Sequence, residues 1–355
     1  MATNIFEDGD ILWDHKKVDS SPKPLQVLYP TVPGAYPVIV FFHGFFIPNT
    51  SYNEMLGHIA SHGYIIVAPK LFTGGFLPMF GPCEVHCAAQ IVNWIAEGLQ
   101  PYLPDNVEAQ LDSLVLAGHS RGGKTAFAVA LGKSPIKLNI KVLLGIDPVA
   151  GLNKCIRTLP EILTYKPESF NLEMPILVIG TGLGPEKANW FLWPCAPDGV
   201  NHKEFFKECK EPRQHFVTKE FGHLDMLDDK ACTPRCECKG RKKHRDLMRK
   251  TIAGLVVAFL RAYLEAQFED LDNIVNHPEL APTTLDEIEP PKRMKLSTGA
   301  TLGRIKTKKL SMFQNEKFLW PRPSSKWQTR KVASWEATVR SPAARLCGVR
   351  VRVSV

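Results

Sequence analysis

The stretch that decides the fold is Leu114-Val-Leu-Ala-Gly-His-Ser-Arg-Gly-Gly-Lys124, an apolar run that leads into a G-x-S-x-G motif. Such a run predicts a buried strand, and a helix-like segment follows it. A G-x-S-x-G motif between a strand and a helix is typical of a nucleophile elbow, a sharp turn that exposes the serine hydroxyl. Gly118 and Gly122 carry no side chain that would crowd this turn. We therefore predict that Ser120 is a nucleophile. The alternative is a serine in a tight loop of an inactive relative.

Apolar runs and helix-like segments alternate on both sides of this motif. Short runs rich in Val, Ile and Leu fit strands that are covered on both faces of a parallel sheet. The predicted strands are Leu25–Tyr29, Val38–Phe42, Ile65–Ala68, Leu114–Gly118, Val142–Ile146, Ile176–Ile179 and His215–Phe221. The predicted helices are Asn53–His62, Glu84–Gly98, Thr125–Gly132 and Asp246–Glu269. This alternation, together with the elbow, predicts an α/β-hydrolase fold with a mostly parallel central sheet and helices on both faces.

A nucleophilic serine needs a base and an acid, and in this fold the three follow one another in the chain order serine, acid, histidine. His223 comes just after the last predicted strand, so we predict that it is the base; the alternative is a surface-loop histidine. Asp147 ends the strand that follows the elbow, where a carboxylate can hold the imidazole tautomer. We predict that Asp147 is the acid. Glu186, after the next strand, remains an alternative.

The oxyanion hole is expected from backbone N–H groups beside the nucleophile. The strand Val38–Phe42 ends in His43-Gly44, so the N–H of Phe45 is placed to pair with the N–H of Arg121. We interpret His43 as a structural residue that shapes this loop. His119 is interpreted in the same way, as a side chain that packs beneath the elbow.

Two aromatic-rich inserts, residues 72–82 and 182–214, interrupt the alternation and are the predicted substrate pocket. Their apolar side chains are not committed to the sheet core and can line a pocket for a ligand. The predicted pocket residues are Phe72, Phe76, Leu77 and Phe80 on the first insert and Trp190, Phe191 and Trp193 on the second. The alternative is that these side chains only pack the loops onto the body.

The nine cysteines are odd in number and irregularly spaced, and no secretory signal precedes them. We therefore predict mostly free thiols and an intracellular compartment. The cluster Cys232-x3-Cys236-x-Cys238 has the spacing of no common zinc site, and the basic residues after it would repel a cation. We expect a loop there, and we expect neither a metal nor an organic cofactor in the protein.

Charge divides the chain into unequal parts. Residues 292–355 hold 16 Lys or Arg and two acids, a net of +14, whereas the rest holds 28 bases and 34 acids, a net of −6. We predict a hydrolase domain over 1–275, an acidic Pro-rich linker over 276–291 and a disordered basic tail over 292–355. The acidic body has no basic stripe interleaved with aromatic residues, which argues against a nucleic-acid partner. The charge of the tail is compatible with peripheral contact to an anionic membrane surface.

No apolar run approaches the roughly 18 residues of a membrane span, so no transmembrane segment is expected. The first ten residues include Glu7, Asp8 and Asp10 and have no apolar core. This argues against a secretory signal and, more weakly, against a plastid transit peptide.

Over about residues 1–290, the chain resembles the plant chlorophyllases. The most specific matching stretches are Gly118-His-Ser-Arg-Gly-Gly-Lys-Thr-Ala-Phe127 and Gly222-His-Leu-Asp-Met-Leu-Asp-Asp229. Further matches include Gly145-Ile-Asp-Pro-Val149 and Gly199-Val-Asn-His202.

This resemblance implies a serine esterase that hydrolyses the phytyl ester of chlorophyll to chlorophyllide and phytol. It also implies a triad of Ser120, Asp147 and His223, with the magnesium ion belonging to the substrate, and a location in the chloroplast or the cytoplasm. Two other functions stay open. One is a general lipase or short-chain carboxylesterase, and the other is a non-catalytic pigment-binding protein.

Overall fold

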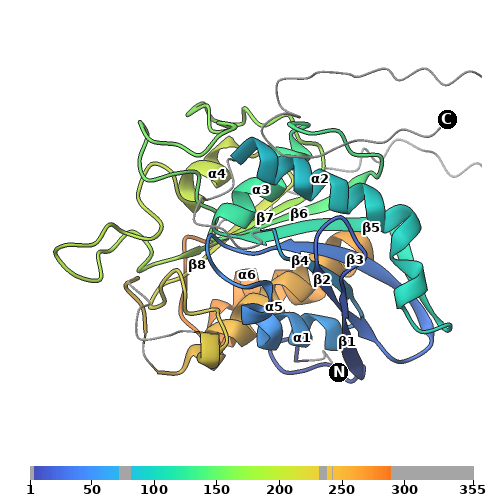
Figure 1. Cartoon of the computed structure of the whole chain (residues 1–355). Coiled ribbons are helices and arrows are strands. Elements are labelled where there is room, and N and C mark those ends of the chain that lie inside the picture. The colour runs from blue at the N-terminus through green and yellow to red at the C-terminus, as the bar shows by residue number, and fades with distance from the viewer. Residues whose placement is uncertain (1–3, 72–80, 232–237, 242, 289–355) are drawn as a thin grey trace, which may run out of the picture. The chain divides into compact units, whose positions relative to one another are not determined.

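The computed structural model describes residues 4–71, 81–231, 238–241 and 243–288 of the 355-residue chain. Within these residues the strands form one sheet in the order β1-β2-β4-β3-β5-β6-β7-β8-β9 (Figure 1). Neighbouring strands from β4 to β8 in that order are parallel, and β1, β2 and β9 are paired antiparallel at the two edges. The strands are β1 (Trp13–Val18), β2 (Leu25–Pro30), β3 (Gly34–Phe42), β4 (Ile65–Pro69), β5 (Val107–His119), β6 (Ile140–Ile146), β7 (Ile176–Thr181), β8 (Arg213–Thr218) and β9 (Leu285–Asp286).

Helices cover both faces of this sheet (Figure 1). They are α1 (Asn53–Ser61), α2 (Gly81–Gly98), α3 (Arg121–Ala130), α4 (His202–Glu208), α5 (Arg245–Leu264) and α6 (Glu269–Asn276). Short 3₁₀ helices lie at Asn49–Tyr52, Gln100–Tyr102, Asp229–Ala231 and Pro278–Leu280. Residues of α1, α5 and α6 contribute to one apolar core, and residues of α2, α3 and α4 contribute to the other. The predicted α/β-hydrolase fold is therefore confirmed.

The alternation of side chains along β3 explains why the strand sequences are continuously apolar. Ile39 and Phe41 point into the core formed with α1 and α5, whereas Val38, Val40 and Phe42 point into the core formed with α2 and α3. A strand buried on both faces has no polar side, so it reads as an unbroken apolar run. All seven predicted strands correspond to strands of the sheet.

Several boundaries differ from the sequence-based expectation. The predicted helix Asp246–Glu269 is two helices, α5 and α6, and β8 ends at Thr218 rather than at Phe221. The elements β1, β9 and α4 were not predicted. β1 lies at an edge with five of its six side chains exposed, and β9 has only two residues, so neither leaves an apolar pattern.

The predicted linker is partly built into the domain. β9 pairs antiparallel with β8, and Ala281, Thr283 and Leu285 are buried. The chain therefore continues to pack on the sheet at least ten residues beyond 275. The predicted basic tail, 292–355, lies outside the described residues.

The cysteines correct one prediction. Cys195 and Cys238 form a disulfide with a Cα–Cα distance of 5.6 Å, and Cys83 is also disulfide-bonded. The interpretation of the cysteines as mostly free thiols is wrong for these residues, because the fold brings together positions 43 residues apart that no spacing pattern links. Cys87, Cys155 and Cys209 are free. The argument for an intracellular compartment from free thiols accordingly loses its basis.

Among the described residues, no helix combines the length and the apolar character needed to cross a bilayer.

Candidate active site

The turn between β5 and α3 has the strained geometry expected of a nucleophile elbow. Ser120 adopts a φ of 57° and a ψ of −126°, a positive-φ conformation that is costly for a residue with a side chain. A Cβ atom on Gly118 would lie 2.4 Å from the carbonyl of Gly122, and one on Gly122 would lie 2.1 Å from the carbonyl oxygen of Phe42. Both glycines are therefore required by close backbone approach, which confirms the predicted turn.

Three side chains from the carboxyl ends of β5, β6 and β8 meet at this turn. Ser120 Oγ lies 2.8 Å from Nε2 of His223, and Nδ1 of His223 lies 2.7 Å from Oδ2 of Asp147. Because a carboxylate can only accept, Nδ1 of the imidazole carries the proton, and Nε2 is left to accept the hydrogen bond from the serine hydroxyl. The structure thus brings together the three residues that chain order predicted.

Asp147 is completely buried, with an exposed fraction of 0%. Burial by itself raises the pKa of this carboxyl group, but the hydrogen bond from His223 and further favourable interactions outweigh it, so the pKa is lower than usual. One of these interactions is a 2.6 Å hydrogen bond donated by the hydroxyl of Thr181, the last residue of β7. The sequence alone did not point to Thr181, although Glu186, the alternative acid, was considered because it follows this same strand.

The alternative acid lies elsewhere. Glu186 forms an ion pair with Lys239 at 3.9 Å, and more than half of its side chain is exposed. Asp225 instead accepts hydrogen bonds from the backbone N–H groups of Gly222 and Arg241, so its carboxylate fixes the shape of the loop that carries His223.

The two residues expected to form the oxyanion hole lie next to each other. Phe45 follows Gly44 at the end of β3, and a Cβ atom on Gly44 would lie 3.3 Å from Cβ of Ser120. The guanidinium of Arg121, the first residue of α3, lies over the Phe45 ring at 4.9 Å from its centroid. The loop after β3 therefore reaches the start of α3, as the proposed pairing of backbone N–H groups requires.

A buried carboxylate that the sequence alone did not point to binds side chains in the first turns of α3. Glu84 of α2 binds Nε of Arg121 at 2.6 Å and accepts a 2.6 Å hydrogen bond from the hydroxyl of Thr125. Burial raises the pKa of Glu84 despite these partners. The pairing ties α2 to the elbow through side chains that leave no distinctive sequence motif.

Two histidines serve the structure of the site, as expected. His43 contacts the carbonyl oxygen of Gly44 at 2.8 Å through Nδ1 and accepts a 3.0 Å hydrogen bond from the N–H of Leu71 through Nε2. Nδ1 of His119 lies 2.8 Å from the hydroxyl of Tyr52, and its Nε2 lies 2.9 Å from the carbonyl oxygen of His223. The sequence alone did not point to Tyr52. Both histidines shape the loops around the site.

The predicted pocket residues divide into two groups. Phe72, Phe76, Leu77 and Phe80 lie outside the described residues. Trp190, Phe191 and Trp193 lie in a loop between β7 and α4 and have exposed fractions of 88%, 90% and 67%. Their rings therefore do not pack on the body, in contrast to the alternative interpretation for this insert.

The sequence of the whole domain can now be compared with known proteins. The sequence model of a family described as Chlorophyllase matches residues 1–292. The chain belongs to the chlorophyllase family. The share of the chain that matches includes every strand and helix described above.

Individual relatives in the chlorophyllase family agree with this assignment. Chlorophyllase-1 of Arabidopsis thaliana is 49% identical over 273 residues, which cover 75% of this chain and 83% of the relative. Chlorophyllase-2 of the same plant is 42% identical over 81% of this chain and 98% of the relative. A protein of Citrus unshiu named "Chlorophyllase-1, chloroplastic" is 41% identical over 76% of this chain and 80% of the relative.

Proposed function

We propose that this member of the chlorophyllase family is a serine esterase that hydrolyses the phytyl ester of chlorophyll, giving chlorophyllide and phytol. The observation that carries the proposal is the hydrogen-bonded series Ser120–His223–Asp147 in a chain of this family. The names of the relatives support the substrate class.

In the proposed mechanism, Oγ of Ser120 attacks the ester carbonyl carbon while Nε2 of His223 takes the hydroxyl proton. The carboxylate of Asp147 holds Nδ1–H of the imidazole and stabilises the imidazolium that forms. Negative charge develops on the carbonyl oxygen, where the N–H groups of Phe45 and Arg121 donate hydrogen bonds to it.

Collapse of this tetrahedral intermediate breaks the bond to the phytyl oxygen, and His223 returns the proton so that phytol leaves. Water then attacks the acyl-enzyme with His223 again as the base, which releases chlorophyllide and restores the serine. The magnesium ion of chlorophyll is part of the substrate in this scheme, and the chain needs no cofactor of its own.

The proposed surroundings of the site follow from the exposed rings. Trp190, Phe191 and Trp193 supply apolar area for a porphyrin or a phytyl chain, together with the first insert. Such exposed rings also suit a peripheral contact with a membrane. The Citrus relatives named chloroplastic favour the chloroplast over the cytoplasm as the compartment.

The test compares the purified chain with its Ser120→Ala variant on chlorophyll and on a short p-nitrophenyl ester. We expect chlorophyllide formation by the wild type and a loss on the order of 10⁶ in the variant. Ser113→Ala, at the other end of the apolar part of β5, is the matched control and should keep its activity.

Three outcomes would contradict the proposal. Near-normal turnover by Ser120→Ala would remove this serine from its role. Cleavage of the short ester without cleavage of chlorophyll would favour a general carboxylesterase. Stoichiometric retention of pigment without ester cleavage would favour a pigment-binding protein.

A further inference from the structure

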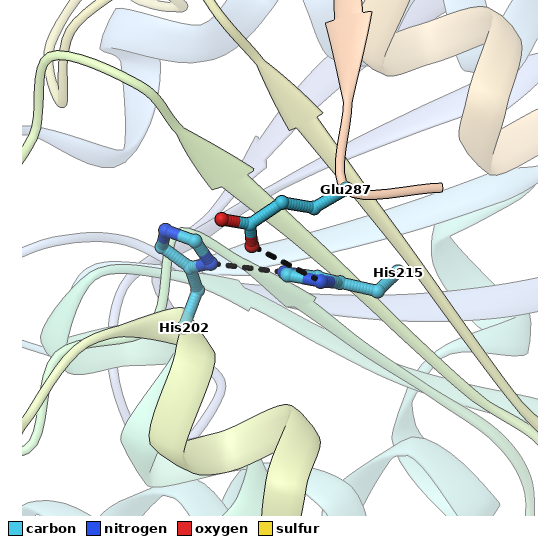
Figure 2. A group of neighbouring side chains, drawn as sticks. All are labelled: His202, His215 and Glu287. Carbon is cyan, nitrogen blue, oxygen red and sulfur yellow. Dashed lines mark hydrogen bonds and ion pairs between the residues drawn. The ribbon is translucent and has the colours of Figure 1, made fainter. Parts of the chain in front are cut away.

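Two histidines and a glutamate from three separate elements meet outside the proposed catalytic residues. His202 is the first residue of α4, His215 lies in β8, and Glu287 directly follows β9. Nδ1 of His202 lies 2.9 Å from Nε2 of His215, and Glu287 Oε2 lies 3.8 Å from Nδ1 of His215. Figure 2 shows the carboxylate of Glu287 beside both rings, and one ligand atom from each residue lies within 4.8 Å of the others.

Both imidazoles are held in the neutral form. The exposed fractions of His202 and His215 are 1% and 3%. Burial, followed by the neighbouring His202 and Lys203, lowers the pKa of His215 to about 3, and burial also lowers the pKa of His202. A neutral imidazole offers a lone pair, which is the form in which histidine binds a metal ion.

We propose that His202, His215 and Glu287 bind a divalent first-row transition-metal ion, with zinc the best suited. Two imidazole nitrogens and one carboxylate oxygen are a set that zinc accepts, with a fourth position left for water. The half-exposed carboxylate of Glu287 gives the ion a path from solvent to the two buried rings.

The two facing nitrogens need only a small adjustment, whereas the carboxylate of Glu287, which lies 3.8 Å from the other nitrogen of His215, has to turn toward the ion. Two nitrogens at 2.0–2.1 Å from a tetrahedral zinc ion are about 3.4 Å apart, so the two rings must separate by about 0.5 Å. The proton now shared between the facing nitrogens moves to the far nitrogen of its own ring. Both imidazoles then remain neutral, and both facing lone pairs point to the ion.

Lys203 controls how tightly this site binds. Its ammonium group lies 3.0 Å from Oε1 of Glu287 and competes with the ion for that carboxylate. Half of the Lys203 side chain is exposed, so it can move into solvent when the ion arrives. Removal of this lysine should therefore tighten metal binding, whereas removal of the Glu287 charge should weaken it.

The experiment is a titration of the full chain with cobalt(II) after alkylation of free thiols, followed by visible absorption. We expect the intense absorption of a four-coordinate cobalt ion, and its loss on addition of zinc. Glu287→Gln should weaken cobalt affinity by about tenfold or more, a range typical of residues that support a metal site. Lys203→Gln should strengthen it. His277→Gln is the control, because His277 is an exposed histidine beside a different acid, Glu279.

Several results would overturn the proposal. One is the absence of cobalt binding, or a weak six-coordinate spectrum only. Another is an equal effect of His277→Gln and Glu287→Gln, which would indicate adventitious surface binding. Because about half of the Glu287 side chain and half of the Lys203 side chain are exposed, their variants should keep the fold, which circular dichroism checks. Zinc should raise the Tm of the wild type, and a rise of the same size in Glu287→Gln would also count against the site.

Discussion

The hydroxyl oxygen of Tyr52 lies 2.8 Å from Nδ1 of His119, the residue before the nucleophilic serine. The same oxygen accepts a 3.0 Å hydrogen bond from the N–H of Gly44. Because the carbonyl oxygen of His223 can only accept, Nε2 of His119 donates to it, and Nδ1 of the neutral ring accepts the hydrogen bond from the Tyr52 hydroxyl. Burial lowers the pKa of His119 well below its usual value, so the ring stays neutral. Hydrogen bonds thus connect the loop after β3 to the loop after β8.

Tyr52→Phe should lower kcat by about 10- to 100-fold with little change in KM, because His119 and the Gly44 N–H each lose a partner near the reacting groups. Steady-state kinetics measure this split. Tyr64→Phe is the control, since Tyr64 is equally buried but hydrogen-bonds to Glu265. Equal losses in kcat for both variants would mean that the effect is one of general stability.

Asp147→Asn should lower kcat by about 10⁴, because an amide in place of the carboxylate favours the wrong tautomer of His223. Glu186→Gln should have little effect, since that carboxylate pairs with Lys239. Both rates come from chlorophyllide formation under saturating substrate. A severe defect in Glu186→Gln with a mild one in Asp147→Asn would refute the assignment of the acid.

Acid should destabilise the fold through buried neutral histidines. Burial lowers the pKa of His43 to about 4 from its usual 6.5. Between these values the unfolded chain binds a proton that the folded chain does not, so the free energy of unfolding falls as pH falls. Over this range His43 alone accounts for a loss on the order of 3 kcal/mol. Urea unfolding across the range should show a shallower pH dependence in His43→Gln, and an unchanged dependence would disprove the contribution.

Replacement of Trp190, Phe191 and Trp193 by serine should reduce turnover of chlorophyll far more than turnover of a short p-nitrophenyl ester. The rings are exposed, so their loss removes ligand-binding area without opening a cavity in the core. The same result is expected for Phe76, Leu77 and Phe80 of the first insert. Leu12→Ser, another exposed apolar position, is the control. Equal losses on both substrates would show that the second insert supports the fold.

Truncation after Pro291 should leave activity on detergent-solubilised chlorophyll nearly unchanged, because the family match ends at residue 292. Truncation after Asn276 should instead lower the Tm, since it removes β9 and the buried residues around it. Thermal unfolding and activity of the two truncated proteins measure the difference. A truncation after Pro291 that fails to fold would show that the tail is needed by the domain.

The sequence predicts the interior of this fold well and its edges poorly. Strands β2 to β8 are buried on one or both faces, so their sequences contain recognisable apolar runs. β1 is an exposed edge strand with the sequence WDHKKV, which has the composition of a loop. β9 exists only because a two-residue segment pairs with β8, a tertiary contact that no local pattern encodes.

Some residues of the site could likewise be predicted from the sequence, and others could not. Ser120 sits in a motif whose strained turn requires particular glycines, and chain order then points to Asp147 and His223. Thr181, Tyr52 and Glu84 belong to no recognisable motif, and their roles depend on neighbours from distant strands and helices. Their types alone do not distinguish a positioning role from an ordinary buried hydrogen bond.

The disulfide between Cys195 and Cys238 encloses His223 in a covalently closed loop, and Ser120 and Asp147 lie outside this loop. Closure of a loop with a sequence separation of 43 removes roughly 4 kcal/mol of chain freedom from the unfolded state. Of the three proposed catalytic residues, only the histidine therefore lies within the segment that this bond closes. Reduction of this bond would remove the cross-link from the segment that carries His223, so the order of the histidine loop depends on the thiol–disulfide balance around the protein.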